Sequence, residues 1–184
     1  MFMINYAKLD ISLDLSCLDG IPLQVHRTLG KRQKYAKEQA ETNTLLPVDV
    51  LLIPSKRAVD YIISQLPSAV LSKEIPEISI LEMNVPRDCK NPMFGTHVDL
   101  ARIATINHYI DANGEETCFY HWLNDKAVPV EKFVAEQDGT YLLDVSVPHS
   151  VKLIPGKSRR ILTMSFMRTP YKDLWRMCAS KIRK

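Results

Sequence analysis

Six short segments between residues 77 and 168 place the strongest constraint on what this chain can fold into. They are rich in Ile, Val, Thr and aromatic residues, and stretches containing Gly, Pro, Asn and Asp separate them, so we predict β-strands joined by turns. The segments are EISILEMNV, RIATINHYI, TCFYHWL, AVPVEKFV, TYLLDVSV and RRILTMSFM. Because nothing of helical length lies between them, we expect an antiparallel sandwich or jelly roll rather than a parallel sheet.

The first 75 residues have a different character. Residues 48–53 (VDVLLI) predict a buried strand, and Ser55 is a suitable N-cap for a following helix. Four apolar residues at helical spacing indicate that helix: Val59, Ile62, Ile63 and Leu66. We therefore expect an α+β fold that is mainly β, with a jelly-roll core and N-terminal helices packed on one sheet.

A length of 184 residues and a mass of 21.0 kDa suit a single domain. In it we expect residues 1–75 to support the barrel, residues 76–168 to form the core and residues 169–184 to form a basic C-terminal helix. A net charge of +3 gives no argument for a nucleic-acid or membrane partner. With no membrane-span-length apolar run, no signal peptide and four widely spaced cysteines, we predict a cytoplasmic protein with free thiols.

Three candidate metal ligands lie in the strand-rich part. His97 and Asp99 stand two residues apart, so in a strand their side chains share a face, and His149 follows the predicted strand 141–147. Two imidazoles and one carboxylate leave other coordination positions open, which is typical of a non-haem Fe(II) oxygenase and unlike a closed zinc site. The alternative interpretation is core packing with local hydrogen bonds, or an ordinary surface ion pair.

An arginine pair opens the last predicted strand. Arg159 and Arg160 precede a segment whose even positions, 162 to 166, are uniformly apolar and are expected to face the core. The same parity places Arg160 inward and Arg159 outward. A buried guanidinium needs an anionic partner, either a carboxylate ligand or an Asp or Glu of the protein. Apolar residues at odd positions interrupt the alternation, so Arg159 stays the alternative for the inward position.

The order H-x-D, then a distal His, then an Arg opening the last strand resembles the Fe(II)/2-oxoglutarate-dependent dioxygenases. The stretches that carry the resemblance are HVDLARIATINHYI and LLDVSVPHSVKLIPGKSRRILTMSF. They look like the small prolyl-hydroxylase-like and aspartyl/asparaginyl-hydroxylase-like branches, over about residues 76–168. The resemblance implies a double-stranded β-helix core of the jelly-roll, cupin-like kind.

The resemblance also implies a role for each candidate residue. Three residues would bind Fe(II): His97, Asp99 and His149. Arg160, or Arg159 in its place, would bind the distal carboxylate of the cosubstrate 2-oxoglutarate. Tyr109 matches a position that often contacts the same carboxylate, and Asn107 shares its strand parity as a weaker candidate. The implied reaction uses O2 to hydroxylate an unactivated C–H bond of an unknown primary substrate: a small molecule, an amino acid or a protein residue.

Two other functions remain as alternatives. One is a cupin-like metal enzyme that does not use 2-oxoglutarate. The other is a non-enzymatic jelly-roll module whose basic tail binds nucleic acid or another polyanion. Residues 168–184 hold six basic residues against the single acidic Asp173. Because no recognition motif accompanies this charge, we favour a terminal helix that packs its apolar face on the barrel.

Overall fold

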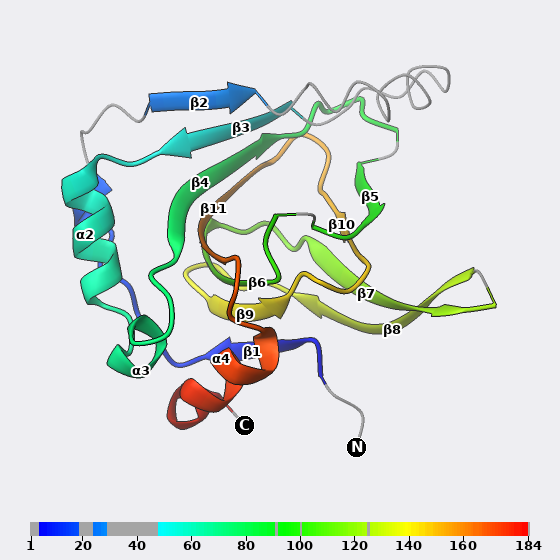
Figure 1. Ribbon diagram of the computed structural model, residues 1–184. Helices are drawn as coiled ribbons and strands as arrows, with labels where there is room; N and C mark the ends of the chain where they lie inside the picture. Colours follow the sequence, from blue (N-terminus) through cyan, green and yellow to red (C-terminus); the bar gives the residue numbers. More distant parts are fainter. Residues whose placement is uncertain are drawn as a thin grey trace.

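The computed structural model describes residues 4–18, 24–28, 48–90, 92–99, 101–124 and 126–183. These residues form two antiparallel β-sheets (Figure 1). The seven-stranded sheet has the order β1 (Tyr6–Leu9), β9 (Thr140–Asp144), β6 (Ala104–Asp111), β11 (Ser158–Phe166), β4 (Glu77–Asn84), β3 (Val48–Ile53) and β2 (Gln24–Thr28). The four-stranded sheet has the order β5 (Met93–His97), β10 (His149–Lys152), β7 (Glu116–Leu123) and β8 (Lys126–Val134).

From β4 onward the chain passes back and forth between the two sheets. Strands β4, β6, β9 and β11 lie in the larger sheet, and strands β5, β7, β8 and β10 form the smaller one. Eight antiparallel strands arranged in this way make a jelly roll, so the predicted core is confirmed. The six predicted segments correspond to β4, β6, β7, β8, β9 and β11. Strands β5 and β10, which were not predicted, complete the smaller sheet.

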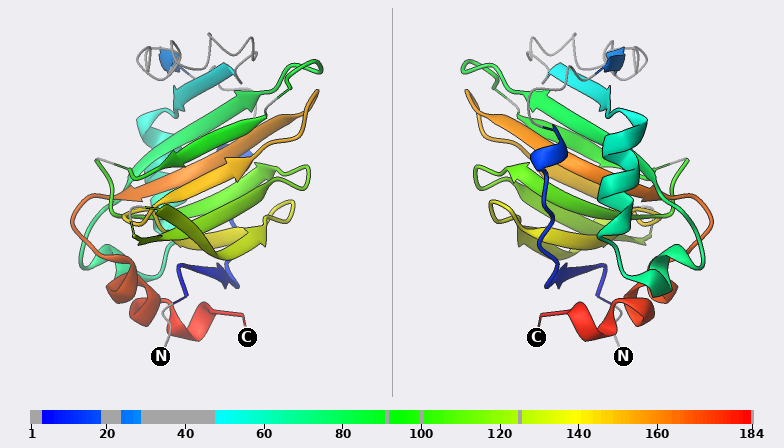
Figure 2. Two further views of the ribbon diagram at one scale, coloured as in Figure 1. Left: turned by 90° about the vertical axis from the view of Figure 1, so that its right-hand side faces the viewer. Right: turned by 90° about the vertical axis from the view of Figure 1, so that its left-hand side faces the viewer.

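Two N-terminal helices, α2 (Lys56–Ser64) and α3 (Ser68–Leu71), pack beside the larger sheet, as predicted; α2 lies in front of its strands in the right-hand view of Figure 2. The Ser55 side chain accepts a hydrogen bond from the backbone N–H of Ala58 at 3.3 Å and so caps α2. Ile62 and Val70 are fully buried in the same apolar cluster as Leu162 of β11. None of the described helices is long and apolar enough to cross a membrane.

The larger sheet has an apolar core on each of its faces. Leu162 and Met164 of β11 belong to the core that includes the helices, which we call the helix-side core. Ile161 belongs instead to the barrel core between the two sheets, together with Tyr109 of β6 and Phe119 of β7. Because side chains alternate along a strand, the odd positions of β11 face the barrel interior.

Two short helices end the described chain: α4 (Tyr171–Met177) and the 3-10 helix η3 (Ala179–Lys181). Another 3-10 helix, η1 (Ser16–Leu18), follows β1. Leu174 and Cys178 are fully buried in the helix-side core, and burial raises the pKa of the Cys178 thiol to about 11. The C-terminal helix is thus shorter than residues 169–184, and its apolar face packs against the protein.

Candidate metal centre

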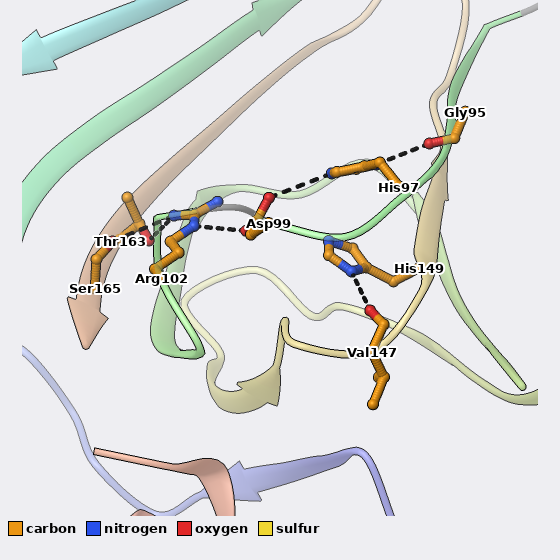
Figure 3. A network of polar contacts seen from close by, with 8 residues as sticks. All are labelled: Gly95, His97, Asp99, Arg102, Val147, His149, Thr163 and Ser165. Atoms are coloured by element: carbon orange, nitrogen blue, oxygen red, sulfur yellow. Dashed lines mark hydrogen bonds and ion pairs between the residues drawn. The ribbon is translucent and has the colours of Figure 1, made fainter. Parts of the chain in front are cut away.

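The three candidate ligands come together at one end of the barrel. His97 ends β5, His149 begins β10, and the two residues are register partners whose ring centroids lie 4.4 Å apart. Asp99 follows two residues after β5, where its backbone N–H donates to the carbonyl of Val145 at 3.2 Å. One ligand atom from each of the three residues lies within 4.8 Å of the others (Figure 3). The prediction that His97 and Asp99 share a strand is wrong, because β5 ends first.

In both histidines the ring nitrogen Nδ1 contacts the backbone carbonyl of the residue two positions earlier. The Nδ1 atom of His97 lies 2.8 Å from the carbonyl oxygen of Gly95, and Nδ1 of His149 lies 3.0 Å from that of Val147. A carbonyl oxygen can only accept, so each Nδ1 carries the proton and donates it. Each Nε2 therefore keeps its lone pair for a metal. Such a hydrogen bond to the far ring nitrogen is the usual support of a metal-bound histidine.

Asp99 is held in its ionised form. Burial alone would raise the pKa of Asp99, but the contacts of its carboxylate with His97 and with the charged Arg102 outweigh it and hold that pKa well below its usual range. His149 shifts in the direction that keeps the ring neutral, because burial and the nearby His97 lower the pKa of its imidazole. An ionised carboxylate and neutral imidazoles are the forms that bind metal ions. The donor set therefore fits a divalent metal with open coordination positions.

Arg102 is a residue of this site that the sequence did not reveal. Its Nε donates to Oδ2 of Asp99 at 2.6 Å, and its Nη1 donates to the hydroxyls of Thr163 at 3.0 Å and Ser165 at 3.3 Å (Figure 3). It lies between β5 and β6, in a stretch without regular structure and hence without a periodic signal. The available hint was a cation three residues after the candidate ligand Asp99.

The structure reverses the predicted orientation of the two arginines. Arg159 is buried, with 4% of its surface exposed, whereas the side chain of Arg160 is 35% exposed and lies 3.8 Å from Glu82. The prediction that Arg160 points inward is therefore wrong. The apolar even positions of β11 do face a core, but it is the helix-side core. Arg159 shares the barrel-facing parity of the strand with Ile161.

Arg159 has contacts but no counter-ion. Its Nη2 donates to the Tyr109 hydroxyl at 3.2 Å, its guanidinium carbon lies 5.2 Å from the Tyr109 ring centroid, and its Nη1 lies 3.8 Å from Sδ of Met83. Its Nε is buried without a partner. Among the described residues no carboxylate pairs with Arg159. A buried cation in this state is costly unless an anion joins it.

A polar strip joins Arg159 to the metal ligands across the inner face of the larger sheet. Asn107 and Thr105 of β6 are register partners of Thr163 and Ser165 of β11, and paired residues of an antiparallel ladder point to the same face. The Oδ1 atom of Asn107 and the Oγ1 atom of Thr105 are buried without a hydrogen-bond partner. The strip therefore holds unsatisfied polar groups beside a buried cation.

Comparisons with known proteins give similarities of fold. No protein-family profile matches the sequence, and no curated protein matches it. A prolyl-4-hydroxylase from Pseudomonas putida is 15% identical with a TM-score of 0.47, over 90% of this chain and 93% of that chain. An oxidoreductase of the 2OG-Fe(II) oxygenase family from Burkholderia pseudomallei is 10% identical with a TM-score of 0.43, over 74% of this chain and 83% of that chain.

A third similar structure is the 7S globulin from Momordica charantia, at 12% identity and a TM-score of 0.41. The match covers 66% of this chain and only 30% of the globulin. At such low identity the likeness concerns the course of the chain alone.

Proposed function

We propose that this protein is an Fe(II)- and 2-oxoglutarate-dependent dioxygenase that hydroxylates an unactivated C–H bond. The observation that carries the proposal is that two features occur together in the interior of the barrel. One is the cluster of His97, Asp99 and His149, which leaves coordination positions open. The other is Arg159, a buried cation for which the described residues provide no counter-ion. It lies on the same face of β11 as Thr163 and Ser165, which hold Arg102 against Asp99.

Fe(II) would be held by Nε2 of His97, Nε2 of His149 and a carboxylate oxygen of Asp99. Bound Fe(II) supplies O2 activation, coupled to the oxidative decarboxylation of 2-oxoglutarate to succinate and CO2. One oxygen atom of O2 enters succinate and the other enters the hydroxyl group of the product. The residues of the chain supply positioning and electrostatics for this reaction.

Arg159 and Tyr109 bind the distal carboxylate of 2-oxoglutarate. A guanidinium presents several N–H donors in one plane and pairs well with a carboxylate. Because the Tyr109 hydroxyl accepts from Arg159, its own proton is free to be donated to the same carboxylate. Asn107 lies on the same polar strip, and its side-chain NH2 group would donate to the cosubstrate, because the oxygens of 2-oxoglutarate only accept hydrogen bonds.

Apolar side chains of the barrel core keep the site dry. Phe119 is fully buried, and its ring centroid lies 6.1 Å from that of His149. Ile161 and Tyr141 belong to the same cluster. Exclusion of water strengthens the attraction between Arg159 and a bound carboxylate.

The test is an anaerobic titration of the protein with Fe(II) and 2-oxoglutarate. We expect the weak visible charge-transfer band of a 2-oxoglutarate chelate, followed by succinate formation when O2 is admitted. A His97→Ala variant should lose the band, whereas His121→Ala, on the exposed part of β7, should keep it. A band that persists in His97→Ala would overturn the ligand assignment. Metal binding without any succinate would favour the cupin-like metal enzyme instead.

A further inference from the structure

Arg102 connects the metal ligand Asp99 to the strand that carries Arg159. One end of the guanidinium contacts Oδ2 of Asp99 at 2.6 Å. The other end contacts Thr163 at 3.0 Å and Ser165 at 3.3 Å, both on β11. Planar guanidinium groups hold such forked contacts with less loss of freedom than an ammonium group. The connection is therefore a rigid one.

The two oxygens of Asp99 have different surroundings. Oδ2 is taken up by Arg102, while Oδ1 lies 3.5 Å from Nε2 of His97. The Asp99 side chain is only 8% exposed, so water does not compete freely for either oxygen. Only Oδ1 is therefore left beside the two imidazoles.

We propose that Arg102 is a positioning residue that makes Asp99 a one-oxygen metal ligand. Carboxylates bind metal ions through one oxygen or through both. A second oxygen on the metal would occupy a position that the cosubstrate or O2 needs, and the chemistry of this ligand set depends on open positions. By engaging Oδ2, Arg102 keeps that position open. This inference rests on the proposed function and adds to it the residue that sets the number of open positions.

The contacts with β11 tie this control to the cosubstrate site. Thr163 and Ser165 face the barrel interior from the same strand as Arg159, at the same parity. A shift of β11 that moved Arg159 would also move the anchor of Arg102. The orientation of Asp99 is therefore set by the strand that binds the distal carboxylate.

The experiment compares Arg102→Ala and the conservative Arg102→Lys with the unaltered protein, using Mn(II) as the metal and N-oxalylglycine as the cosubstrate analogue. Calorimetry measures the affinity for Mn(II), and then the affinity of the Mn(II) complex for N-oxalylglycine. Proton relaxation counts the exchangeable waters on bound Mn(II). Arg176→Ala is the matched control, since Arg176 is exposed and pairs with Asp173 at 3.2 Å, away from the candidate metal ligands.

For Arg102→Ala we expect retained Mn(II) binding, about one exchangeable water fewer and an affinity for N-oxalylglycine lower by about tenfold or more. Arg102→Lys should fall between the two, because it keeps the charge but not the fork. Unchanged water count and N-oxalylglycine affinity in Arg102→Ala would overturn the proposal. So would an equal loss of both affinities with the water count unchanged, which is what a merely structural role predicts.

A second variant covers the case in which Arg102→Ala does not fold. Thr163→Val combined with Ser165→Ala removes the anchors of Arg102 and keeps the residue itself. It should lower the affinity for N-oxalylglycine more than that for Mn(II), and an unchanged ratio of the two affinities contradicts the proposal. Failure of the proposed function has a different signature: the unaltered protein would bind Mn(II) but not N-oxalylglycine.

Discussion

Arg159 and Tyr109 form a buried pair in which Nη2 of the guanidinium donates to the phenol oxygen across 3.2 Å. A phenol is neutral at ordinary pH, so this bond satisfies one donor and leaves the charge uncompensated. Among the described residues, the neighbouring Arg160 is the arginine of β11 that has an ion-pair partner: it lies 3.8 Å from Glu82 at a partly exposed position. The pair thus carries a positive charge that an anionic ligand would balance.

The first prediction concerns Arg159→Met. We expect the affinity of the metal-loaded protein for N-oxalylglycine to fall at least about tenfold, because a hydrogen bond to a charged group contributes about 1.5–3 kcal/mol. Replacing an uncompensated buried charge with an apolar side chain should leave the free energy of unfolding of the unliganded protein unchanged or raise it. Calorimetry and denaturant unfolding measure the two quantities.

Arg160→Met is the matched control for that variant. Its side chain is 35% exposed and pairs with Glu82 on the other side of the sheet from Arg159, so binding of N-oxalylglycine should not change. The opposite ranking, with Arg160→Met abolishing binding and Arg159→Met tolerated, would show that the two roles have been assigned the wrong way round.

The two arginines also show where inference from the sequence stops. The strand, its alternation and the need for one inward guanidinium were all readable. The sequence did not show which face of this strand lines the barrel interior, because the larger sheet is covered on both faces. In β11 the more uniformly apolar face is buried by the N-terminal helices, and the barrel-facing residues Thr163 and Ser165 are polar and accept hydrogen bonds from Arg102. The face with the stronger hydrophobic signal was therefore the wrong one.

The metal cluster was more accessible to sequence reasoning than its surroundings. His97, Asp99 and His149 were named from residue types and spacing alone, and the structure brings them together. The strands that carry the histidines, β5 and β10, were missed because they are short and of mixed polarity. Arg102 was missed because two of its partners, Thr163 and Ser165, lie 61 and 63 residues further along the chain, and no local pattern encodes such contacts.

A second prediction separates the proposed metal ligands from His108, another buried histidine. His149→Ala should abolish measurable Mn(II) binding, because it removes one of three ligands from a buried site. His108→Gln should keep it, since Nδ1 of His108 lies 2.9 Å from the hydroxyl of Thr140, away from the cluster. Calorimetry with Mn(II) decides. Equal losses in the two variants would point to general unfolding rather than ligation.

A third prediction concerns stability at low pH. Glu74 is buried and accepts four hydrogen bonds, from the backbone N–H groups of Met167, Arg168 and Thr169 and from the Thr169 hydroxyl. Burial alone would raise the pKa of Glu74, but these bonds lower it below its ordinary value of 4.5. The stabilisation is therefore complete above about pH 4.5 and is lost as the pH falls through the lowered pKa.

Glu74→Gln tests this assignment. At neutral pH the variant should unfold with a free energy lower by about 1–3 kcal/mol, since an amide accepts these bonds less well and brings an unpaired donor into a buried site. Its stability should also depend less on pH below pH 4.5 than that of the unaltered protein. Denaturant unfolding across an acid series measures both. Parallel pH curves for the two proteins would refute the role of this carboxylate.

A fourth prediction addresses the basic C-terminal segment. Leu174 is fully buried in the helix-side core, so Leu174→Ala should lower the free energy of unfolding by about 2–5 kcal/mol. Two cations of the segment already have partners, because Arg176 pairs with Asp173 at 3.2 Å and Arg183 pairs with Asp10 at 2.9 Å. Lys172 is exposed, and exposed charges contribute little to stability, so Lys172→Ala should change the free energy of unfolding only slightly.

The same variants weigh the binding-module alternative against this structural role. A segment that serves to pack the barrel predicts that Lys172→Ala and Lys181→Ala leave retention on a heparin column unchanged. A segment that binds a polyanion predicts salt-sensitive retention that falls in these variants, while Leu174→Ala acts on folding alone. Because the side chains that face the core and those that face solvent are different residues of α4 and η3, the two roles can be measured separately.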